Sequence, residues 1–395
     1  MKLIRDPIHG EIAVDDRDLD LLDSPEVQRL RRIKQIGLGH LVYPGANHTR
    51  FEHSVGTMYI AGQLCDRMGF DEWTRRKMVV SALLHDLGHG PFSHTTEKFS
   101  SQVFGLDHSE LTLRGIVKGP ISEVLADMDL DPTEIGLIAS GRGHDLAGLL
   151  HSQVGLDRMD YLMRDAHYTG VAYGVIDHQR ILSTLIFRGG EIMIREKGSQ
   201  AAESLLVARF LMYPSVYLHH VSRIADAMLF RALEDATARD ISVEEIMGMD
   251  DMSLVSRLLQ EEGPVKEMVT RILNRSLYKR AVYAPPSGVQ DLDSLIELSG
   301  DRGRLRELED EIAAEAGIEP GGVLIDVQDR PRRDETEIKV LSGSEVSTLG
   351  TISTLVKSLR DAEWNYWRFG VYCAKEDLEK VREVCVDHGW PGLER

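Results

Sequence analysis

The chain has 395 residues, 42% of them hydrophobic, which excludes a disordered chain and allows a large packed core with a second, smaller lobe. The formal net charge is −18, so broad binding to nucleic acid is not expected, and any phosphate site needs its own local group of basic side chains. No apolar run is long enough to span a membrane, and no signal peptide begins the chain. Three widely spaced cysteines, Cys65, Cys373 and Cys385, favour a reduced, cytoplasmic protein.

The predicted elements are mainly helical up to about residue 270. Ser24-Pro25-Glu26 is typical of a helix start, because serine caps the first turn and proline fits its first position. A short strand is expected near residues 11–14, and a β-hairpin over 187–196. Helical spacing of apolar residues predicts further helices over 54–69, 74–86, 108–117, 121–128, 133–139, 145–166, 177–184 and 199–235.

The C-terminal third has a different pattern. Strands are predicted over 281–283, 322–327, 338–341 and 366–373, and helices over 302–316, 349–362 and 375–388. We therefore expect a mainly α fold, with a helical core over residues 1–270 and a smaller α+β lobe over residues 271–395.

Side chains typical of a metal site lie between residues 50 and 165. His85-Asp86 ends a helix that is apolar nearly all round, and burying two such side chains is unfavourable unless a ligand satisfies them. His53 comes earlier, and Asp157 can share a helical face with Asp160. Two imidazoles and two carboxylates suit a divalent ion that polarises water and a phosphate oxygen. Each residue alone also fits a core or surface position, so their joint occurrence is the indication.

The order His53, His85-Asp86, Asp157 resembles the HD-domain phosphohydrolases. Longer motifs resemble their deoxynucleoside triphosphate triphosphohydrolase (dGTPase-like) branch, densely over residues 1–225 and loosely beyond. These motifs are Asp6-Pro7-Ile8-His9-Gly10, Arg29-Leu30-Arg31-Arg32-Ile33-Lys34-Gln35, Tyr43-Pro44-Gly45-Ala46, Arg50-Phe51-Glu52-His53-Ser54, Gly88-His89-Gly90-Pro91-Phe92-Ser93-His94 and Asp157-Arg158-Met159-Asp160-Tyr161.

The resemblance implies one divalent metal ion, held by His53, His85, Asp86 and Asp157. Mixed histidine and aspartate ligation does not choose among manganese, iron, zinc, nickel and magnesium. The resemblance also places three catalytic histidines beside the α-phosphate: His89, His94 and His108.

His108 matches the family's general acid for the leaving 5′-oxygen. The family has an acidic residue directly after this histidine, whereas here Ser109 follows and Glu110 comes one position later. The group that orients His108 is therefore open.

The resemblance further implies a set of substrate contacts. Arg158 stands where the human member of the branch has lysine, which keeps the charge but changes the geometry. The phosphate contacts are Arg50, Arg158, Tyr161 and Arg209, the contacts to the sugar 3′-hydroxyl are Gln35 and Asp165, and Tyr217 lies under the deoxyribose.

Asp23, Gln28 and Arg31 match residues with which this branch reads an activating guanine nucleotide. A departure is Arg5, where the human member has asparagine. The alternative is an ordinary helix N-terminus, with Gln28 and Arg31 on a solvated face. An effector that bridges subunits implies a homo-oligomer, a dimer or a tetramer.

The function expected from this resemblance is metal-dependent hydrolysis of deoxynucleoside triphosphates, dGTP or dNTPs generally, to deoxynucleoside and inorganic triphosphate. One alternative is an HD phosphohydrolase that acts on nucleoside monophosphates or signalling nucleotides. A second is a nucleotide-sensing or nucleic-acid-binding protein, for which the short basic run Arg330, Arg332 and Arg333 is the only local support we identify in the sequence.

Overall fold

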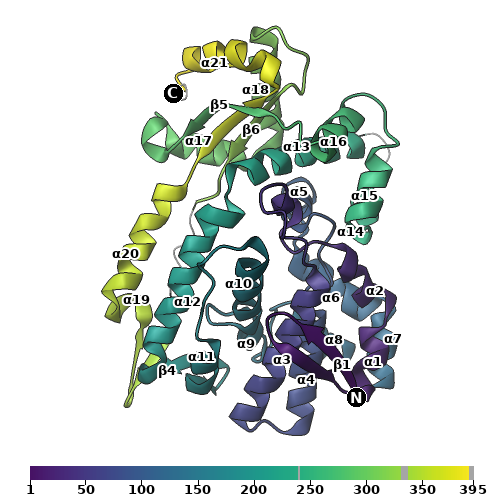
Figure 1. Cartoon of the computed structure of the whole chain (residues 1–395), viewed down its shortest axis with the longest axis vertical. Helices are drawn as coiled ribbons and strands as arrows, with labels where there is room; N and C mark the ends of the chain where they lie inside the picture. Colours follow the sequence, from purple (N-terminus) through teal and green to yellow (C-terminus); the bar gives the residue numbers. More distant parts are fainter. Residues whose placement is uncertain (239–240, 331–336, 391–395) are drawn as a thin grey trace. The chain divides into compact units, whose positions relative to one another are not determined.

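The structure is a computed structural model that describes residues 1–238, 241–330 and 337–390. Contacts between Cα atoms divide the chain into two compact units (Figure 1). Unit 1 comprises residues 1–93, 106–216 and 334–360, and unit 2 comprises 94–105, 217–333 and 361–395. The predicted mainly α fold is confirmed. The predicted domains, residues 1–270 and 271–395, are each one continuous segment, whereas each compact unit combines several separate segments. The predicted domain boundary at residue 270 therefore stays a prediction.

Unit 1 contains most of the helices, and α3 and α4 pack against each other within it (Figure 1). Its helices are α1 (Leu19–Leu22), α2 (Pro25–Arg29), α3 (Arg50–Met68), α4 (Glu72–Leu84), α6 (His108–Lys118), α7 (Ile121–Asp127), α8 (Pro132–Ala139), α9 (Ala147–His151), α10 (Leu156–Thr169), α11 (His178–Thr184), α12 (Ser199–Met212), α19 (Leu349–Ile352) and most of α20 (Thr354–Ala362).

Unit 1 also has two small sheets. The N-terminal arm is an antiparallel hairpin of β1 (Lys2–Asp6) and β2 (Gly10–Val14). The second sheet has the order β3-β4-β7-β8, built from β3 (Leu185–Arg188), β4 (Glu191–Arg195), β7 (Lys339–Ser342) and β8 (Glu345–Thr348). β4 pairs with β7 in parallel, so the strand predicted over 338–341 joins the hairpin near residue 190 in one sheet.

Unit 2 is built around the three-stranded sheet β5-β9-β6, whose central strand β9 pairs antiparallel with both neighbours. These strands are β5 (Lys279–Ala284), β6 (Val323–Val327) and β9 (Phe369–Cys373), and the helices of the unit are α5 (Ser93–Phe104, from His94 onward), α13 (His220–Thr237), α14 (Val243–Gly248), α15 (Asp251–Leu258), α16 (Pro264–Leu273), α17 (Leu292–Ser299), α18 (Arg302–Glu315) and α21 (Leu378–Asp387). The sequence did not predict α5, α14, α15, α16 or α17 of this unit, nor α1 of unit 1. The helix predicted over 199–235 is interrupted by a π-helical turn over Tyr213–Tyr217.

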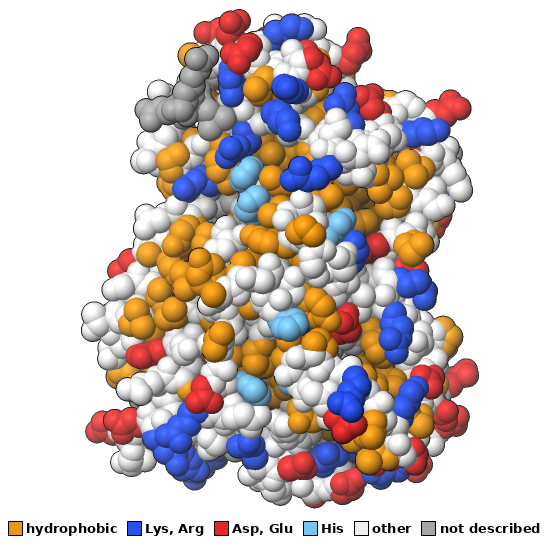
Figure 2. All heavy atoms as spheres, viewed as in Figure 1, with side chains coloured by type: hydrophobic (Ala, Val, Ile, Leu, Met, Phe, Trp, Pro, Cys, Tyr) orange, Lys and Arg blue, Asp and Glu red, His pale blue; other side chains and the backbone are white. Residues whose placement is uncertain are grey.

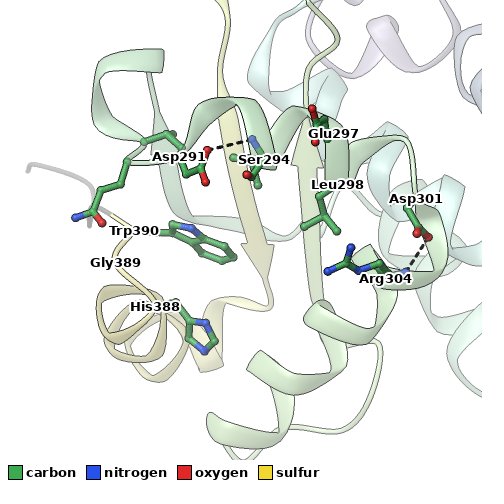
Figure 3. Close-up of a pocket in the computed structure, with 12 residues that line it drawn as sticks. Asp291, Ser294, Glu297, Leu298, Asp301, Arg304, His388, Gly389 and Trp390 are labelled. Carbon is green, nitrogen blue, oxygen red and sulfur yellow. Dashed lines mark hydrogen bonds between the residues drawn. The ribbon is translucent and has the colours of Figure 1, made fainter.

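A pocket of about 590 Å³ lies in unit 2 beside α17 (Figure 3). Trp390 and His388 lie on one side of it, and Asp291 and Asp301 cap the helices that line the other side. None of the metal or substrate residues expected from the sequence lines this pocket. Over the described residues, no helix has the length and apolar character needed to cross a membrane.

Gly56 on α3 allows α10 to approach closely. A Cβ atom added at Gly56 would lie 2.0 Å from Asp160 Oδ1 and 2.4 Å from Arg164 Nη2. Both of these α10 side chains are fully buried and have no room to move away. The contact between α3 and α10 therefore requires glycine at this position.

We predict that Gly56→Ala lowers the free energy of unfolding by about 1–3 kcal/mol, because it overpacks a rigid contact. The control is Gly115→Ala on α6, where a Cβ would meet no atom within 4 Å. Alanine at this exposed helical position should raise the free energy of unfolding by about 0.5–1 kcal/mol. Urea unfolding of the metal-free protein, followed by circular dichroism, measures both. Equal effects of the two substitutions would contradict the prediction.

Candidate functional site

Three helices of unit 1 bring together the histidines and aspartates expected to bind metal. His53 lies in the first turn of α3, His85 caps the C-terminus of α4, and Asp157 lies in the first turn of α10. The helix predicted to begin at residue 54 begins at Arg50 instead. A capping box explains this, because the Glu52 carboxylate accepts a hydrogen bond from the Thr49 backbone N–H at 2.6 Å.

The donor atoms of these three residues converge on one point. His53 Nε2 lies 3.2 Å from His85 Nε2 and 2.9 Å from Asp157 Oδ1, and His85 Nε2 lies 3.7 Å from Asp157 Oδ1. The two imidazoles are buried, whereas the Asp157 side chain is 29% exposed. The cluster is therefore open to solvent on the side of Asp157.

Hydrogen bonds on the far side of each ring indicate which nitrogen carries the proton. His53 Nδ1 lies 2.8 Å from Asp160 Oδ2, and His85 Nδ1 lies 2.8 Å from the carbonyl oxygen of Ala82. Both of these partners are acceptors, so each Nδ1 donates and each neutral ring directs the lone pair of Nε2 toward the other ring. Two lone pairs and a carboxylate oxygen at these distances repel one another unless a positive charge lies between them.

That positive charge can be a proton or a metal ion. Burial opposes a charged ring, yet the hydrogen bonds to Asp157 and Asp160 raise the pKa of His53 to about 10. A divalent cation competes with the proton for the same nitrogen. Imidazole nitrogens whose opposite N–H groups are held by a carboxylate and a carbonyl are the arrangement found around bound metal ions, so the donor set fits a divalent metal.

Asp86 lies beside this cluster as the fourth expected ligand. Its Oδ1 is 3.4 Å from His85 Nε2, and its Oδ2 is 3.9 Å from His53 Nε2. Oδ2 also accepts a hydrogen bond from Arg50 Nη1 at 2.6 Å. Burial would raise the pKa of Asp86, but the Arg50 guanidinium holds it well below its usual range. Asp86 is therefore a carboxylate that Arg50 and a metal ion would share.

Arg50 is less available for a phosphate than the sequence suggested. It is 4% exposed, and its Nε donates to Ser93 Oγ at 2.6 Å while Nη1 binds Asp86. Ser93 Oγ in turn donates to the carbonyl oxygen of Gly90 at 2.9 Å. These bonds tie the start of α3 to the loop after α4, and the role of Arg50 in phosphate binding stays a prediction.

His89 and His108 form a stacked pair, with ring centroids 4.6 Å apart and an interplanar angle of 10°. Burial and the charge of Arg50 lower the pKa of His89 to about 4. His108 begins α6, which approaches the loop at Gly88, where a Cβ would lie 2.4 Å from the carbonyl oxygen of His108. The carboxylate of Glu110 binds Arg114 and Arg142.

Apart from Arg50 and Tyr217, the residues expected to bind the triphosphate and the sugar fall into two groups within unit 1. Arg209 is buried, with its guanidinium 4.9 Å from the centroid of the Tyr213 ring. Burial raises the pKa of Tyr161, while the charges of Arg158 and Arg209 oppose that rise, so these three side chains share one electrostatic environment. Arg158 also donates to the side-chain oxygen of Gln153.

The second group is linked through His48. The backbone N–H of Gln35 donates to the carbonyl oxygen of His48 at 3.0 Å, and His48 Nε2 lies 2.7 Å from Asp165 Oδ1. The two predicted sugar contacts therefore lie on either side of one buried histidine. His94 and Tyr217 belong to unit 2, and their roles stay predictions.

The three predicted effector residues are all engaged within unit 1. Arg31 Nε donates to Gln28 Oε1 at 2.8 Å, and the Arg31 guanidinium lies 3.5 Å from the centroid of the Phe51 ring. Asp23 Oδ1 accepts from Lys2 Nζ at 3.1 Å. The structure thus brings Gln28 and Arg31 together and links Asp23 to the N-terminal arm.

The basic run considered for nucleic acid has little support. Arg330 is paired with Asp293, and Arg332 and Arg333 lie outside the described residues. The face shown in Figure 2 carries both acidic and basic side chains.

The sequence did not reveal the contacts through which two groups hold the site in place. Arg29 Nη2 donates to the carbonyl oxygens of Leu87 and His89, both at 2.9 Å, and so clamps the loop after α4. Asp160 binds both His53 and Arg164. The four-residue spacing of Asp160 and Arg164 was a signal for their pairing, but the contact to His53 spans 107 positions.

Comparison with protein families gives two matches along the chain. An HD domain matches residues 50–123, which include His53, His85 and Asp86, and an HD-associated region matches residues 176–388, more than half of the chain. The chain belongs to the HD-domain phosphohydrolase superfamily. As an HD protein it is a hydrolase of a family whose domains bind divalent metals, and the donor geometry above agrees with this.

Relatives of this HD protein span archaea, bacteria and eukaryotes. An uncharacterized protein of Methanocaldococcus jannaschii is 40% identical over 97% of this chain and 81% of its own length. The deoxynucleoside triphosphate triphosphohydrolase SAMHD1 homolog of Dictyostelium discoideum is 29% identical over 70% of this chain, and SAMHD1 of Gallus gallus is 26% identical over 76%. The HD protein spans 59% of the length of each of these two enzymes.

Two solved structures have the same fold over nearly the whole HD protein. A hypothetical protein from Aquifex aeolicus is 30% identical, with a TM-score of 0.77 over 97% of this chain and 99% of its own. A phosphohydrolase from Bacteroides thetaiotaomicron is 24% identical, with a TM-score of 0.76 over 95% of this chain and 100% of its own. The second likeness shows the fold alone.

We predict that Arg50→Met lowers the free energy of unfolding of the metal-free protein by about 3–5 kcal/mol, because it leaves the buried Asp86 carboxylate without its guanidinium. Ser93→Ala removes one hydrogen bond from the same arginine and should lower it by about 0.5–1.5 kcal/mol. Urea unfolding in the presence of a chelator measures both values. An Arg50→Met effect no larger than that of Ser93→Ala would show that the ion pair contributes little.

Proposed function

We propose that this HD protein hydrolyses deoxynucleoside triphosphates to deoxynucleoside and inorganic triphosphate, using one divalent metal ion held by His53, His85, Asp86 and Asp157. The observation that carries the proposal is the convergence of two imidazole lone pairs and a carboxylate oxygen, with Arg50 bound to the neighbouring Asp86 carboxylate. Relatives named as deoxynucleoside triphosphate triphosphohydrolases favour this substrate class over other nucleotides.

The bound metal would supply Lewis-acid chemistry, that is, activation of water and polarisation of a phosphate oxygen. In the reaction, water adds to the α-phosphorus, and the bond from that phosphorus to the 5′-oxygen breaks. The 5′-oxygen leaves with a proton as the deoxynucleoside, and the three phosphates leave together. The protein must therefore provide a proton donor and a balance for the triphosphate charge.

In this proposal His108 gives the proton to the leaving 5′-oxygen. An imidazole suits this role because it exchanges protons near neutral pH. The ring of His108 is half-buried and is held in the stacked pair with His89, which restricts its orientation. His89 and His94 complete the histidines proposed to lie beside the α-phosphate.

Arg158 and Arg209 provide most of the positive charge for the triphosphate, with Tyr161 beside them. Arg50 contributes where its bonds to Asp86 and Ser93 leave a donor free to reach a phosphate oxygen. Gln35 and Asp165 hold the 3′-hydroxyl, and Tyr217 packs under the deoxyribose. Assembly into a homo-oligomer and a cytoplasmic location stay predictions, and the choice among manganese, iron, zinc, nickel and magnesium stays open.

Replacing both His85 and Asp86 by alanine should remove the bound metal and the release of inorganic triphosphate together. The measurements are metal analysis of the purified protein and chromatography of the products from each of the four dNTPs. Release of triphosphate by the double variant would overturn the proposal. Release of orthophosphate from a nucleoside monophosphate by the wild-type protein, with no triphosphate from any dNTP, would favour the alternative in which other nucleotides are the substrates.

A guanine nucleotide bound at Asp23, Gln28 and Arg31 is proposed to activate hydrolysis. We predict that GTP or dGTP raises the rate with the other dNTPs, and that Arg31→Ala removes this activation while unstimulated hydrolysis remains. Rates with each dNTP, with and without GTP, test this in both proteins. Unchanged rates in the wild-type protein would leave these residues as an ordinary helix N-terminus.

A further inference from the structure

The turn of the N-terminal arm is fixed by Asp6. Asp6 Oδ1 accepts hydrogen bonds from the backbone N–H groups of Ile8 at 2.9 Å and His9 at 2.8 Å, and Oδ2 accepts from Arg164 Nη1 at 2.7 Å. Gly10 follows with φ of +78°, a conformation that favours glycine. These contacts fix the backbone from which the ring of His9 projects toward α10.

The ring of His9 forms a hydrogen bond with the carboxylate of Asp160. His9 Nε2 lies 2.7 Å from Asp160 Oδ1, and the ring packs against Tyr59 with centroids 5.2 Å apart. A second ring, His178, meets it edge-on at 6.2 Å. The His9 side chain is 2% exposed, so its orientation is set by these neighbours rather than by solvent.

Each carboxylate oxygen of Asp160 already accepts two hydrogen bonds. Oδ1 receives His9 Nε2 and Arg164 Nη2, and Oδ2 receives His53 Nδ1 and Arg164 Nε, all between 2.7 and 2.9 Å. An ionised carboxylate only accepts, so His9 Nε2 and His53 Nδ1 must both be donors. His9 and His53 thus bind opposite oxygens of one carboxylate that is 0% exposed.

We propose that His9 is a positioning residue for the metal centre, acting through Asp160 to hold His53 with its Nε2 lone pair toward the metal. This inference rests on the metal site of the proposed function. The donor of His9 at Oδ1 acts together with Arg164, which binds both oxygens, to hold the carboxylate in the plane that meets His53 Nδ1 and to share its negative charge. Partners in this position orient a ligating histidine and set its basicity.

The test compares side chains at position 9 that differ in the reach of their donor. In His9→Gln the amide nitrogen takes the place of Nε2 and can still reach Asp160, whereas in His9→Asn the amide is too short. His9→Leu keeps apolar volume and removes the donor. The control is His178→Ala, which removes a ring beside His9 but does not touch Asp160.

Each full-length protein is freed of metal with a chelator and titrated with Mn²⁺ by calorimetry, with free Mn²⁺ measured by electron paramagnetic resonance. We expect the Kd for Mn²⁺ to rise about 10–100-fold in His9→Leu and His9→Asn, which is the effect of losing such an outer partner. His9→Gln should bind close to the wild-type value, and His178→Ala should equal it. Thermal unfolding of each variant identifies any that do not fold.

If folded His9→Leu and His9→Asn bound Mn²⁺ with wild-type affinity, the inference about His9 would be overturned. The proposed function would stand, because the wild-type protein would still bind metal and release triphosphate. If His9→Gln bound Mn²⁺ as weakly as His9→Asn, the inference would also be overturned. That result would show that the wild-type ring acts through its packing and not through the N–H group that it donates to Asp160. A wild-type protein that binds no divalent metal would overturn both this inference and the proposed function.

Discussion

The carboxylate of Asp160 is the interaction on which the site in unit 1 depends. It joins three segments that are far apart in the sequence, since it binds His9 of the arm, His53 of α3 and Arg164 of its own helix. A buried carboxylate is unfavourable unless its partners are complete, and here each oxygen has two donors. Gly56 makes this arrangement sterically possible, because only glycine lets α3 come this close to the side chains of Asp160 and Arg164. The position of His53 relative to His85 and Asp157 follows from this packing.

Electrostatics within the site differ from those of the whole chain. The net charge is −18, yet Arg50, Arg158 and Arg209 lie in the same unit as the convergent histidines. Arg50 already donates hydrogen bonds to Asp86 and Ser93, so its main role is to stabilise the Asp86 carboxylate rather than to bind a substrate phosphate. The proposed triphosphate charge therefore falls mainly on Arg158 and Arg209, which lie near Tyr161.

The expected metal ligands come partly from the segment that matches the HD domain and partly from beyond it. The HD match covers His53 on α3 and the His85-Asp86 pair at the end of α4, while Asp157 comes from α10, beyond the end of that match. The loop after α4, which lies within that match, is held by Arg29 and by the approach of α6 at Gly88. The metal donors thus come from a short continuous segment and one helix that packs across it.

The sequence by itself determined the mainly α fold, the family and the residues whose donor atoms converge, because those residues stand in long ordered motifs. It did not place the start of α3, since a helix start at Arg50 depends on the reciprocal bonds of Thr49 and Glu52. It did not reveal that residues 339–341 pair with residues 193–195, because parallel pairing between distant strands leaves no local signal. Only the tertiary structure decided that Arg50 is turned toward Asp86 and that His9 reaches Asp160. Both contacts join residues far apart in the chain, and burial, rather than local pattern, gives them their strength.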